Sequence, residues 1–246
     1  MNFIAKTDIG KKRKNNEDAY FAKVYNENVS LFIVADGLGG YKSGEVASSI
    51  LVNTVSNCFE ESIKHIDLTI SDSKVKAILT KALSIANEKI FNLEKTDIKY
   101  KGMGTTIVLV TKIYGKIYYM SIGDSRLYFL DNELTCIKQV TEDDTYVNEL
   151  LKTNVITKEE VVNHPQKHVL TKAVGIFNKV DATVRKLNTK GGYLLLCTDG
   201  LTNMMGNIEI LNTFKKYQFD EIATKLVFKA NLRGGNDNIT VVIIKI

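Results

Sequence analysis

The sequence has few residues of the kinds that divide a chain into separate units. Its 246 residues include a single proline, Pro165, and no stretch rich in proline, glycine or serine that is typical of a linker. The sequence also has no internal repeat and no low-complexity segment. We therefore expect residues 1–246 to form one domain, long enough to bury a sizeable core.

Cysteine is scarce, and its pattern excludes a disulfide framework. The three cysteines, Cys58, Cys136 and Cys197, are odd in number and have no regular spacing. This pattern is typical of a reducing compartment, and we expect each cysteine to be a small buried hydrophobic residue. The N-terminus also lacks the apolar core of a signal peptide, so the sequence predicts a cytoplasmic protein.

Long apolar runs and a strong charge asymmetry are missing too. No run approaches the ~20 residues needed to cross a bilayer, so we expect no membrane association. The net charge is +5, and the densest basic run is Lys11-Lys12-Arg13-Lys14. Nucleic-acid binding needs a broader basic stripe with aromatic partners, so we expect no nucleic-acid partner. The sequence has no exposed apolar stripe of the kind that predicts an obligate dimer, so we expect a monomer.

The secondary structure that the sequence predicts is a mixture of strands and helices in separate groups. Residues rich in Val, Ile, Tyr, Phe and Thr predict strands in three groups, at 2–36, at 105–140, and at 182–198 together with 238–246. Helical periodicity covers Ser43 to Phe59, Asp72 to Leu93 and residues 220–231. This order predicts an α+β fold, with antiparallel sheets stacked face to face and helices outside.

The polar segment 141–170 interrupts this pattern. Thr157 and Glu160 within it form a capping box that opens a short helix. We expect this segment to be a surface flap, a kind of element that often carries substrate contacts.

Two apolar runs far apart in the sequence end in the same dipeptide. Residues 31–35 lead into Asp36 and Gly37, and residues 193–198 lead into Asp199 and Gly200. An Asp-Gly pair after one strand is usually a hairpin turn. Neither of these pairs is followed by a matching strand, however, because helical segments come next. The repetition therefore favours two carboxylates aimed off strand ends.

Two further acids stand at the opposite ends of their strands, Asp18 before residues 19–24 and Asp237 before residues 238–244. In an antiparallel ladder the end of one strand lies beside the start of its neighbour, so all four acids are expected at one edge of the fold. Carboxylates that converge repel each other by about 4 kcal/mol per pair at ~4 Å and an effective dielectric near 20. We therefore expect a cationic partner.

The acid set has no histidine or cysteine neighbour, so its donors are all hard oxygens: Asp18, Asp36, Asp124, Asp199 and Asp237. Such a set selects Mg²⁺ or Mn²⁺, and the Gly37 carbonyl is a candidate for a further ligand. Two hard cations bridged by a carboxylate are the usual apparatus for displacement at phosphorus. Arg13 is the candidate to hold phosphate oxygens, although a solvated loop arginine explains it about as well.

Two weaker signals are set aside. Residues 37–43 are similar to a phosphate-binding P-loop, but Tyr41 stands where a glycine must precede the lysine, so we exclude a nucleotide site. His164 and His168 have the i, i+4 spacing of a zinc helix, but Pro165 intervenes and no glutamate accompanies them, and His65 follows a helix end. We expect them at the surface.

In chain order, the motifs combine into a set that covers nearly the whole sequence. They are Thr7-Asp8-Ile9-Gly10, Arg13, Asn15-Asn16-Glu17-Asp18, Asp36-Gly37-Leu38-Gly39-Gly40, Gly44-Glu45-Val46-Ala47-Ser48, Gly102-Met103-Gly104-Thr105-Thr106, Gly123-Asp124-Ser125-Arg126, Leu170-Thr171-Lys172-Ala173-Val174-Gly175, Thr198-Asp199-Gly200-Leu201-Thr202 and Gly234-Gly235-Asn236-Asp237-Asn238. This ordered set closely resembles the metal-dependent protein phosphatases of type 2C, in their compact bacterial form.

The resemblance implies a four-layer α-β-β-α sandwich and hydrolysis of phosphoserine and phosphothreonine in proteins. It implies two Mn²⁺ or Mg²⁺ ions, with Asp36 as bridging ligand, Gly37 as carbonyl ligand, and Asp199 and Asp237 as further ligands. Glu17 and Asp18 would act through metal-bound waters, and Arg13 would hold the phosphate. A water that bridges the two metals, held by Asp36, would be the nucleophile. Asp124 is similar to the ligand of a weaker third metal.

Several positions depart from the family pattern. Leu38 stands where other members have histidine or methionine, and a leucine cannot donate a proton to the leaving group. Residues 143–145 replace the usual Asp-His-Ser, and Lys172 replaces a common arginine. These changes bear on substrate preference more than on metal binding, because every position of the expected ligand set is filled.

The leading hypothesis is a phosphatase that acts on phosphorylated proteins and reverses a bacterial serine/threonine kinase. A catalytically silent relative that binds phosphoproteins is an alternative from another class, and in it a loss of ligands would be expected. A phosphatase of small phosphomonoesters would share the metal chemistry. A purely structural metal-stabilised domain does not explain Arg13 beside the acids.

Overall fold

The computed structural model describes residues 1–39 and 43–246 of the chain. Tyr41, on which the exclusion of a P-loop rests, therefore lies outside the described residues. Within the described part, none of the helices has the length and apolar character that crossing a membrane requires.

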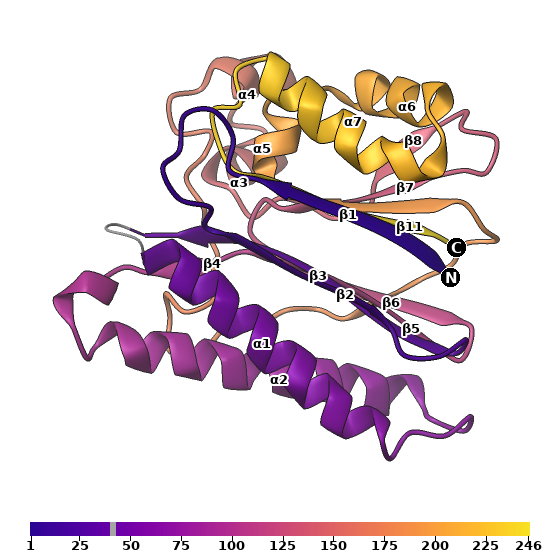
Figure 1. Cartoon of the computed structure of the whole chain (residues 1–246). Helices are drawn as coiled ribbons and strands as arrows, with labels where there is room; N and C mark the ends of the chain where they lie inside the picture. The colour runs from indigo at the N-terminus through magenta and orange to yellow at the C-terminus, as the bar shows by residue number, and fades with distance from the viewer. Residues whose placement is uncertain (40–42) are drawn as a thin grey trace.

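Four layers make up the fold, as Figure 1 shows. Two antiparallel sheets lie face to face, and α1 (Ser43–Ile63) and α2 (Asp72–Glu94) cover the outer face of one of them. The outer face of the other sheet is covered by α6 (Asn207–Lys216) and α7 (Phe219–Leu232). The predicted α+β sandwich is confirmed.

The sheet under α6 and α7 brings together the two ends of the described chain. Its strand order is β1-β11-β10-β7-β8, so the last strand lies between the first strand and β10. The bounds are β1 (Asn2–Asp8), β11 (Ile239–Lys245), β10 (Tyr193–Cys197), β7 (Arg126–Leu130) and β8 (Ile137–Gln139). All of these pairs are antiparallel.

The second sheet, under α1 and α2, has the order β2-β3-β5-β6-β9, with the short β4 paired to the end of β3. The bounds are β2 (Asp18–Val24), β3 (Val29–Leu38), β4 (Gly104–Thr105), β5 (Ile107–Ile113), β6 (Lys116–Ile122) and β9 (Arg185–Leu187). A 3₁₀ turn, η1 (Ile98–Tyr100), follows α2. Every strand pair in this sheet is also antiparallel.

The central strands are apolar throughout because both of their faces are covered. In β3, Leu31 and Ile33 pack against α1 and α2, whereas Phe32 and Val34 point between the two sheets. Side chains alternate between the faces of a strand, so a continuous apolar run fits a strand that is buried on both sides. The outer cluster under α6 and α7 completes the core.

Each predicted helical segment is present, and α3 (Tyr146–Lys152) and α6 are additional helices. The segments predicted at 43–59, 72–93 and 220–231 extend by one to four residues beyond the expected ends. In the flap, α3 precedes α4 (Lys158–Asn163), and the predicted capping box of α4 is present. The helix α6 was not predicted, because its short apolar face of Ile210, Leu211 and Phe214 spans little more than one turn.

One prediction about the cysteines is wrong. Cys197 is buried as expected, but Cys58 is half-buried and Cys136 is exposed. Cys136 lies in the turn before β8, where its backbone N–H donates to the Asp131 carboxylate. The hydrophobic character of a cysteine therefore did not decide its position in that turn.

Burial between the sheets predicts a large effect of removing Phe32. Its side chain is fully buried and contacts Phe3 edge to face, with ring centroids 5.4 Å apart. We expect Phe32→Ala to lower the free energy of unfolding by about 3–5 kcal/mol in a urea titration. The exposed Phe228 is the control, and Phe228→Ala should change it by less than about 0.5 kcal/mol. A loss under about 1 kcal/mol for Phe32→Ala would contradict this description of the core.

Candidate active site

The predicted acids come from both sheets and lie at the end of the sandwich away from the two termini. Asp18 opens β2 and is paired in register with Asp36 near the end of β3, which confirms that these two lie side by side. In the other sheet, Asp199 begins α5 (Asp199–Thr202) directly after β10, and Asp237 precedes β11. Adjacent antiparallel strands thus supply one acid each in both sheets.

A threonine hydroxyl connects the two halves of this cluster. Thr198 donates from its hydroxyl to Asp18 Oδ2 at 2.9 Å, and its backbone N–H donates to the Thr240 carbonyl at 3.1 Å. The same hydroxyl accepts the Thr240 backbone N–H at 3.0 Å. Thr198 is fully buried, and it holds β10, β11 and β2 in a fixed relation at the cluster.

Burial of like charges changes the protonation of the cluster. Burial, and then the charges of Asp199 and Asp237, raise the pKa of Asp18 to about 7. Burial and the neighbouring charges of Asp18 and Asp199 raise the pKa of Asp36 well above its usual value. For Asp199, burial and the charge of Asp237 raise the pKa, and a hydrogen bond with Asp36 offsets part of the rise. The cluster therefore favours any species that brings positive charge.

Two carboxylate oxygens in the cluster have no partner. Asp18 Oδ1 and Asp199 Oδ1 are buried and form no hydrogen bond. An unsatisfied buried oxygen of this kind is costly, and a bound cation would satisfy it. Because these donors are hard oxygens, they fit Mg²⁺ or Mn²⁺. Among residues 1–39 and 43–246, however, no three acidic, histidine or cysteine side chains already form a compact metal-holding group.

Arg13 is the cationic partner that lies at this cluster. Its Nη2 donates to Asp237 Oδ2 at 2.7 Å, and both side chains are partly exposed. The charge of Arg13 also lowers the pKa of Glu17, against a larger rise from burial. This position is the one expected for an arginine that holds phosphate. In the structure the same guanidinium contacts one oxygen of Asp237.

The positions after Asp36 and Asp199 require glycine for the same structural reason. A Cβ added to Gly37 would lie 2.1 Å from the Gly44 carbonyl oxygen, and one added to Gly200 would lie 1.9 Å from the Asn238 carbonyl oxygen. Neither position leaves room for a side chain. The repeated Asp-Gly pair therefore places backbone against backbone next to each acid, rather than forming a hairpin turn.

Sequence reasoning gave no individual role to three residues that orient the acids. Asn203 donates from Nδ2 to Asp199 Oδ2 at 2.9 Å. Asn238 accepts the Glu17 backbone N–H at 2.8 Å and donates to the carbonyls of Ile9 and Asn15, both at 2.9 Å. Thr198 connects the sheets as described above. A buried polar residue directly beside an expected acid is the signal that could have identified Asn238 and Thr198.

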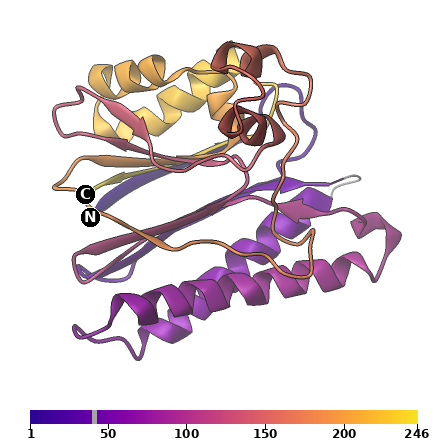
Figure 2. The ribbon, with the colours of Figure 1, turned by 180° about the vertical axis from the view of Figure 1, so that it is seen from behind.

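Asp124 lies between β6 and β7 at the edge of a cavity of about 470 Å³ that also reaches Asp199 and the flap. Burial, and then the charges of Asp199 and Asp143, raise the pKa of Asp124 to about 7. Figure 2 shows the two short flap helices, α3 and α4, near this end of the sheets. Asp124 thus lies on the flap side of the cluster.

The unusual residues at the start of the flap have structural partners. Arg126 forms a bidentate ion pair with Asp143, with Nη2 and Oδ2 2.7 Å apart, and Thr145 caps α3. Lys172 pairs with Asp144 at 3.1 Å. These contacts fasten the flap to β7 and to the segment after the flap.

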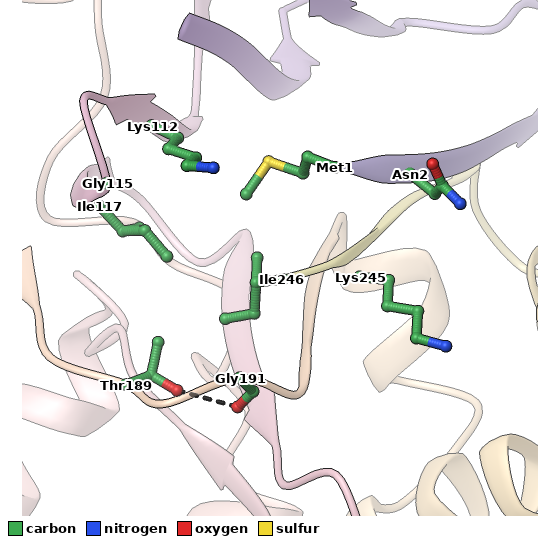
Figure 3. Close-up of a pocket in the computed structure, with 9 residues that line it drawn as sticks. All are labelled: Met1, Asn2, Lys112, Gly115, Ile117, Thr189, Gly191, Lys245 and Ile246. Atoms are coloured by element: carbon green, nitrogen blue, oxygen red, sulfur yellow. Dashed lines mark hydrogen bonds between the residues drawn. The ribbon is translucent and has the colours of Figure 1, made fainter. Parts of the chain in front are cut away.

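Neither the histidines nor a second cavity adds a carboxylate to the cluster. His65 and His168 are exposed as expected, but His164 is only partly exposed and lies against the Tyr146 ring. Another cavity, of about 390 Å³, lies beside the two termini (Figure 3). Lys112 and Lys245 are its only charged side chains among the described residues, so it lacks the carboxylates that the chemistry requires.

Comparisons with known proteins agree with this geometry. The model of the protein phosphatase 2C family matches residues 10–233. The chain is 36% identical over 243 residues to the serine/threonine phosphatase stp of Listeria monocytogenes, covering 98% of this chain and 94% of that protein. The Mycobacterium tuberculosis serine/threonine phosphatase PstP/Ppp is 31% identical, with a TM-score of 0.86 over 98% of this chain and 97% of its own.

A further solved structure bears on metal binding. The catalytic domain of the serine/threonine protein phosphatase PstP, in complex with two manganese ions, is 30% identical and has a TM-score of 0.80. The match covers 98% of this chain and 96% of that chain.

The raised pKa values predict how the stability of the metal-free protein depends on pH. Asp18 and Asp124 have a pKa of about 7 when folded, against about 3.9 when unfolded, so the folded chain binds more protons between these values. The stability they contribute is complete below about pH 4 and is lost as the pH rises through about 7. We expect the melting temperature in EDTA to fall by about 5 °C or more between pH 5 and pH 8.

The control for this prediction is Asp124→Asn, which should make the decrease between pH 5 and pH 8 smaller. Surface carboxylates such as Asp72 do not interfere, because the hydrogen bond from Lys116 lowers the pKa of Asp72 below this range. A melting temperature that stays constant or rises over the same range would show that the carboxylates are not held together as described.

Proposed function

The chain belongs to the protein phosphatase 2C family and is a serine/threonine protein phosphatase, and we propose that its buried carboxylates hold two divalent cations. The observation that carries this proposal is the cluster of four aspartates, in which burial and the neighbouring charges raise the pKa of Asp18, Asp36 and Asp199. Two oxygens of the cluster lack any partner. Such a set is stable with charge only when cations compensate it.

In this proposal each acid has its own role. Asp36, the Gly37 carbonyl, Asp199 and Asp237 would hold the two cations, with Asp36 as the ligand of both. Glu17 and Asp18 would hold ordered waters rather than the cations themselves, and Asp124 with Asp199 would hold a weaker third cation. Mn²⁺ or Mg²⁺ fits these donors, and the manganese complex of the related PstP domain supports Mn²⁺.

When bound, two such cations lower the pKa of a shared water and neutralise charge on the phosphoryl oxygens. The residues of the chain supply the geometry. Arg13 has five N–H donors in a planar fork, so it can hold phosphate oxygens once Asp237 turns to a cation. Leu38 is apolar and donates no proton, so the leaving serine or threonine oxygen takes its proton from another group.

We also propose the setting in which this activity works. The protein acts as a monomer of one domain, residues 1–246, and reverses a serine/threonine kinase in the cytoplasm, without a nucleic-acid or membrane partner. Support comes from the three free cysteines, which are typical of a reducing compartment, and from the lack of a basic stripe in the sequence.

The two other hypotheses fit the observations less well. A silent phosphoprotein-binding relative would be expected to have lost some of the acids, but Asp36, Asp199 and Asp237 are all present at the cluster. Two of the curated relatives are named serine/threonine phosphatase stp and protein phosphatase PhpP.

We expect Asp199→Ala to lower the rate of phosphate release from a phosphothreonine peptide in Mn²⁺ by about a hundredfold or more, because it removes a cation ligand. Wild-type release should stop in EDTA. The exposed Asp181 is the matched control, and Asp181→Ala should retain full activity. Near-wild-type release by Asp199→Ala, or release that continues in EDTA, would contradict the metal assignment.

Arg13→Ala should mainly raise the KM for phosphopeptides, by about tenfold, because a charge-assisted contact of about 1.5–3 kcal/mol to the phosphate is lost. The kcat should change less. Lys14→Ala removes a positive charge from the same loop and should leave the KM nearly unchanged. An unaltered KM in Arg13→Ala would mean that other groups hold the phosphate.

A further inference from the structure

A groove of about 800 Å³ lies between α1 and the last turns of α2, and one end of it begins beside the carboxylate cluster. Asn16 and Glu45 line the end near the cluster. Farther along, the groove is lined by Ser49, Ile50, Asn53, Asn57, Lys89 and Leu93. Figure 1 shows α1 and α2 lying side by side beneath the sheet, and α1 begins at the same end of the sandwich as the cluster.

The groove is continuous with the site through three contacts. The Asn16 side-chain carbonyl accepts the backbone N–H of Asp18 at 3.2 Å. Gly44, directly before Glu45, lies so close to Gly37 that an added Cβ would be 2.8 Å from the Gly37 carbonyl oxygen. The Ser48 hydroxyl, one residue before Ser49 on α1, donates to the Glu17 carbonyl at 2.6 Å. A chain that leaves the cluster on this side therefore enters the groove.

The chemistry of the groove suits an extended polypeptide. Ser49, Asn53 and Asn57 are exposed and stand one helical turn apart, so they form a row along α1. Asparagine amides can both donate and accept, as peptide backbones require. Beside this row, Ile50 and Leu93 are half-buried and give an apolar strip for a side chain of the bound segment.

The length and charge of the groove limit its occupant. From Glu45 to Asn57 the helix rises about 18 Å, which corresponds to roughly five residues of extended chain. Glu45 and Lys89 are the only charged side chains among the described residues that line it. A nucleic acid would need several positive charges in such a groove.

We propose that this groove binds the segment of a phosphoprotein substrate that flanks the phosphorylated residue, over about five residues on one side. The proposal rests on the phosphatase function given above, because the phosphorylated residue itself occupies the carboxylate end. It assigns part of the substrate recognition to α1, outside the flap.

The test compares a short phosphothreonine peptide, with one residue on each side, with peptides extended by five neutral residues on the N-terminal or the C-terminal side. We expect one of the two extensions to raise kcat/KM about tenfold, mainly through KM. Ser49→Trp fills the groove without changing its charge and should remove this gain. Ser84→Trp makes the same change at an exposed position of α2 outside the groove and should keep the gain.

Hydrolysis of p-nitrophenyl phosphate in Mn²⁺ should be equal in wild type, Ser49→Trp and Ser84→Trp, because this substrate does not reach the groove. If the wild type did not hydrolyse p-nitrophenyl phosphate, that result would contradict the proposed function but not the groove. The groove has its own readout in Mn²⁺, where a fluorescent long peptide with a non-hydrolysable phosphonate in place of the phosphate should bind Ser49→Trp at least fivefold more weakly than Ser84→Trp. Equal affinity of these two variants, or no benefit from either extension, would overturn the proposal.

Discussion

Repulsion among carboxylates at the junction of two sheets is the constraint on which the rest of the site depends. Asp18 and Asp36 belong to one sheet, and Asp199 and Asp237 flank strands of the other. Burial raises the pKa of Asp18, Asp36 and Asp199, so the cluster is stable only with protons, with Arg13 or with cations. The fold holds the charges together at this cost, and the same cost gives the site its affinity for positive charge.

The surrounding residues are arranged to keep this strained cluster in place. Thr198 joins three strands through its hydroxyl and backbone, and Asn238 fixes the loop that carries Glu17. Gly37 and Gly200 allow backbone segments to approach more closely than any side chain would permit. Buried polar groups that have all of their hydrogen-bond partners make a structure rigid. A site that shares protons and cations requires this rigidity.

Much of this arrangement could be predicted from the sequence, because strand patterns and strand ends are local features. Runs rich in Val, Ile, Tyr, Phe and Thr located the strands, and the antiparallel rule placed Asp18 beside Asp36. A polar residue beside an expected acid points to Thr198, but its contact with Asp18 could not be predicted, because the two residues lie 180 positions apart in the chain. The helix α6 and the exposed Cys136 were missed for a similar reason: a short apolar face and one turn residue carry too little local signal.

The position of β11 has a consequence for synthesis on the ribosome. This strand comes after every other strand of both sheets in the chain, yet it lies between β1 and β10, and Asp237 directly precedes its first residues. The first strand, β1, therefore cannot join its sheet until nearly all of the described chain has been made. A nascent or prematurely terminated chain would lack both the strand that connects β1 to β10 and one of the four acids.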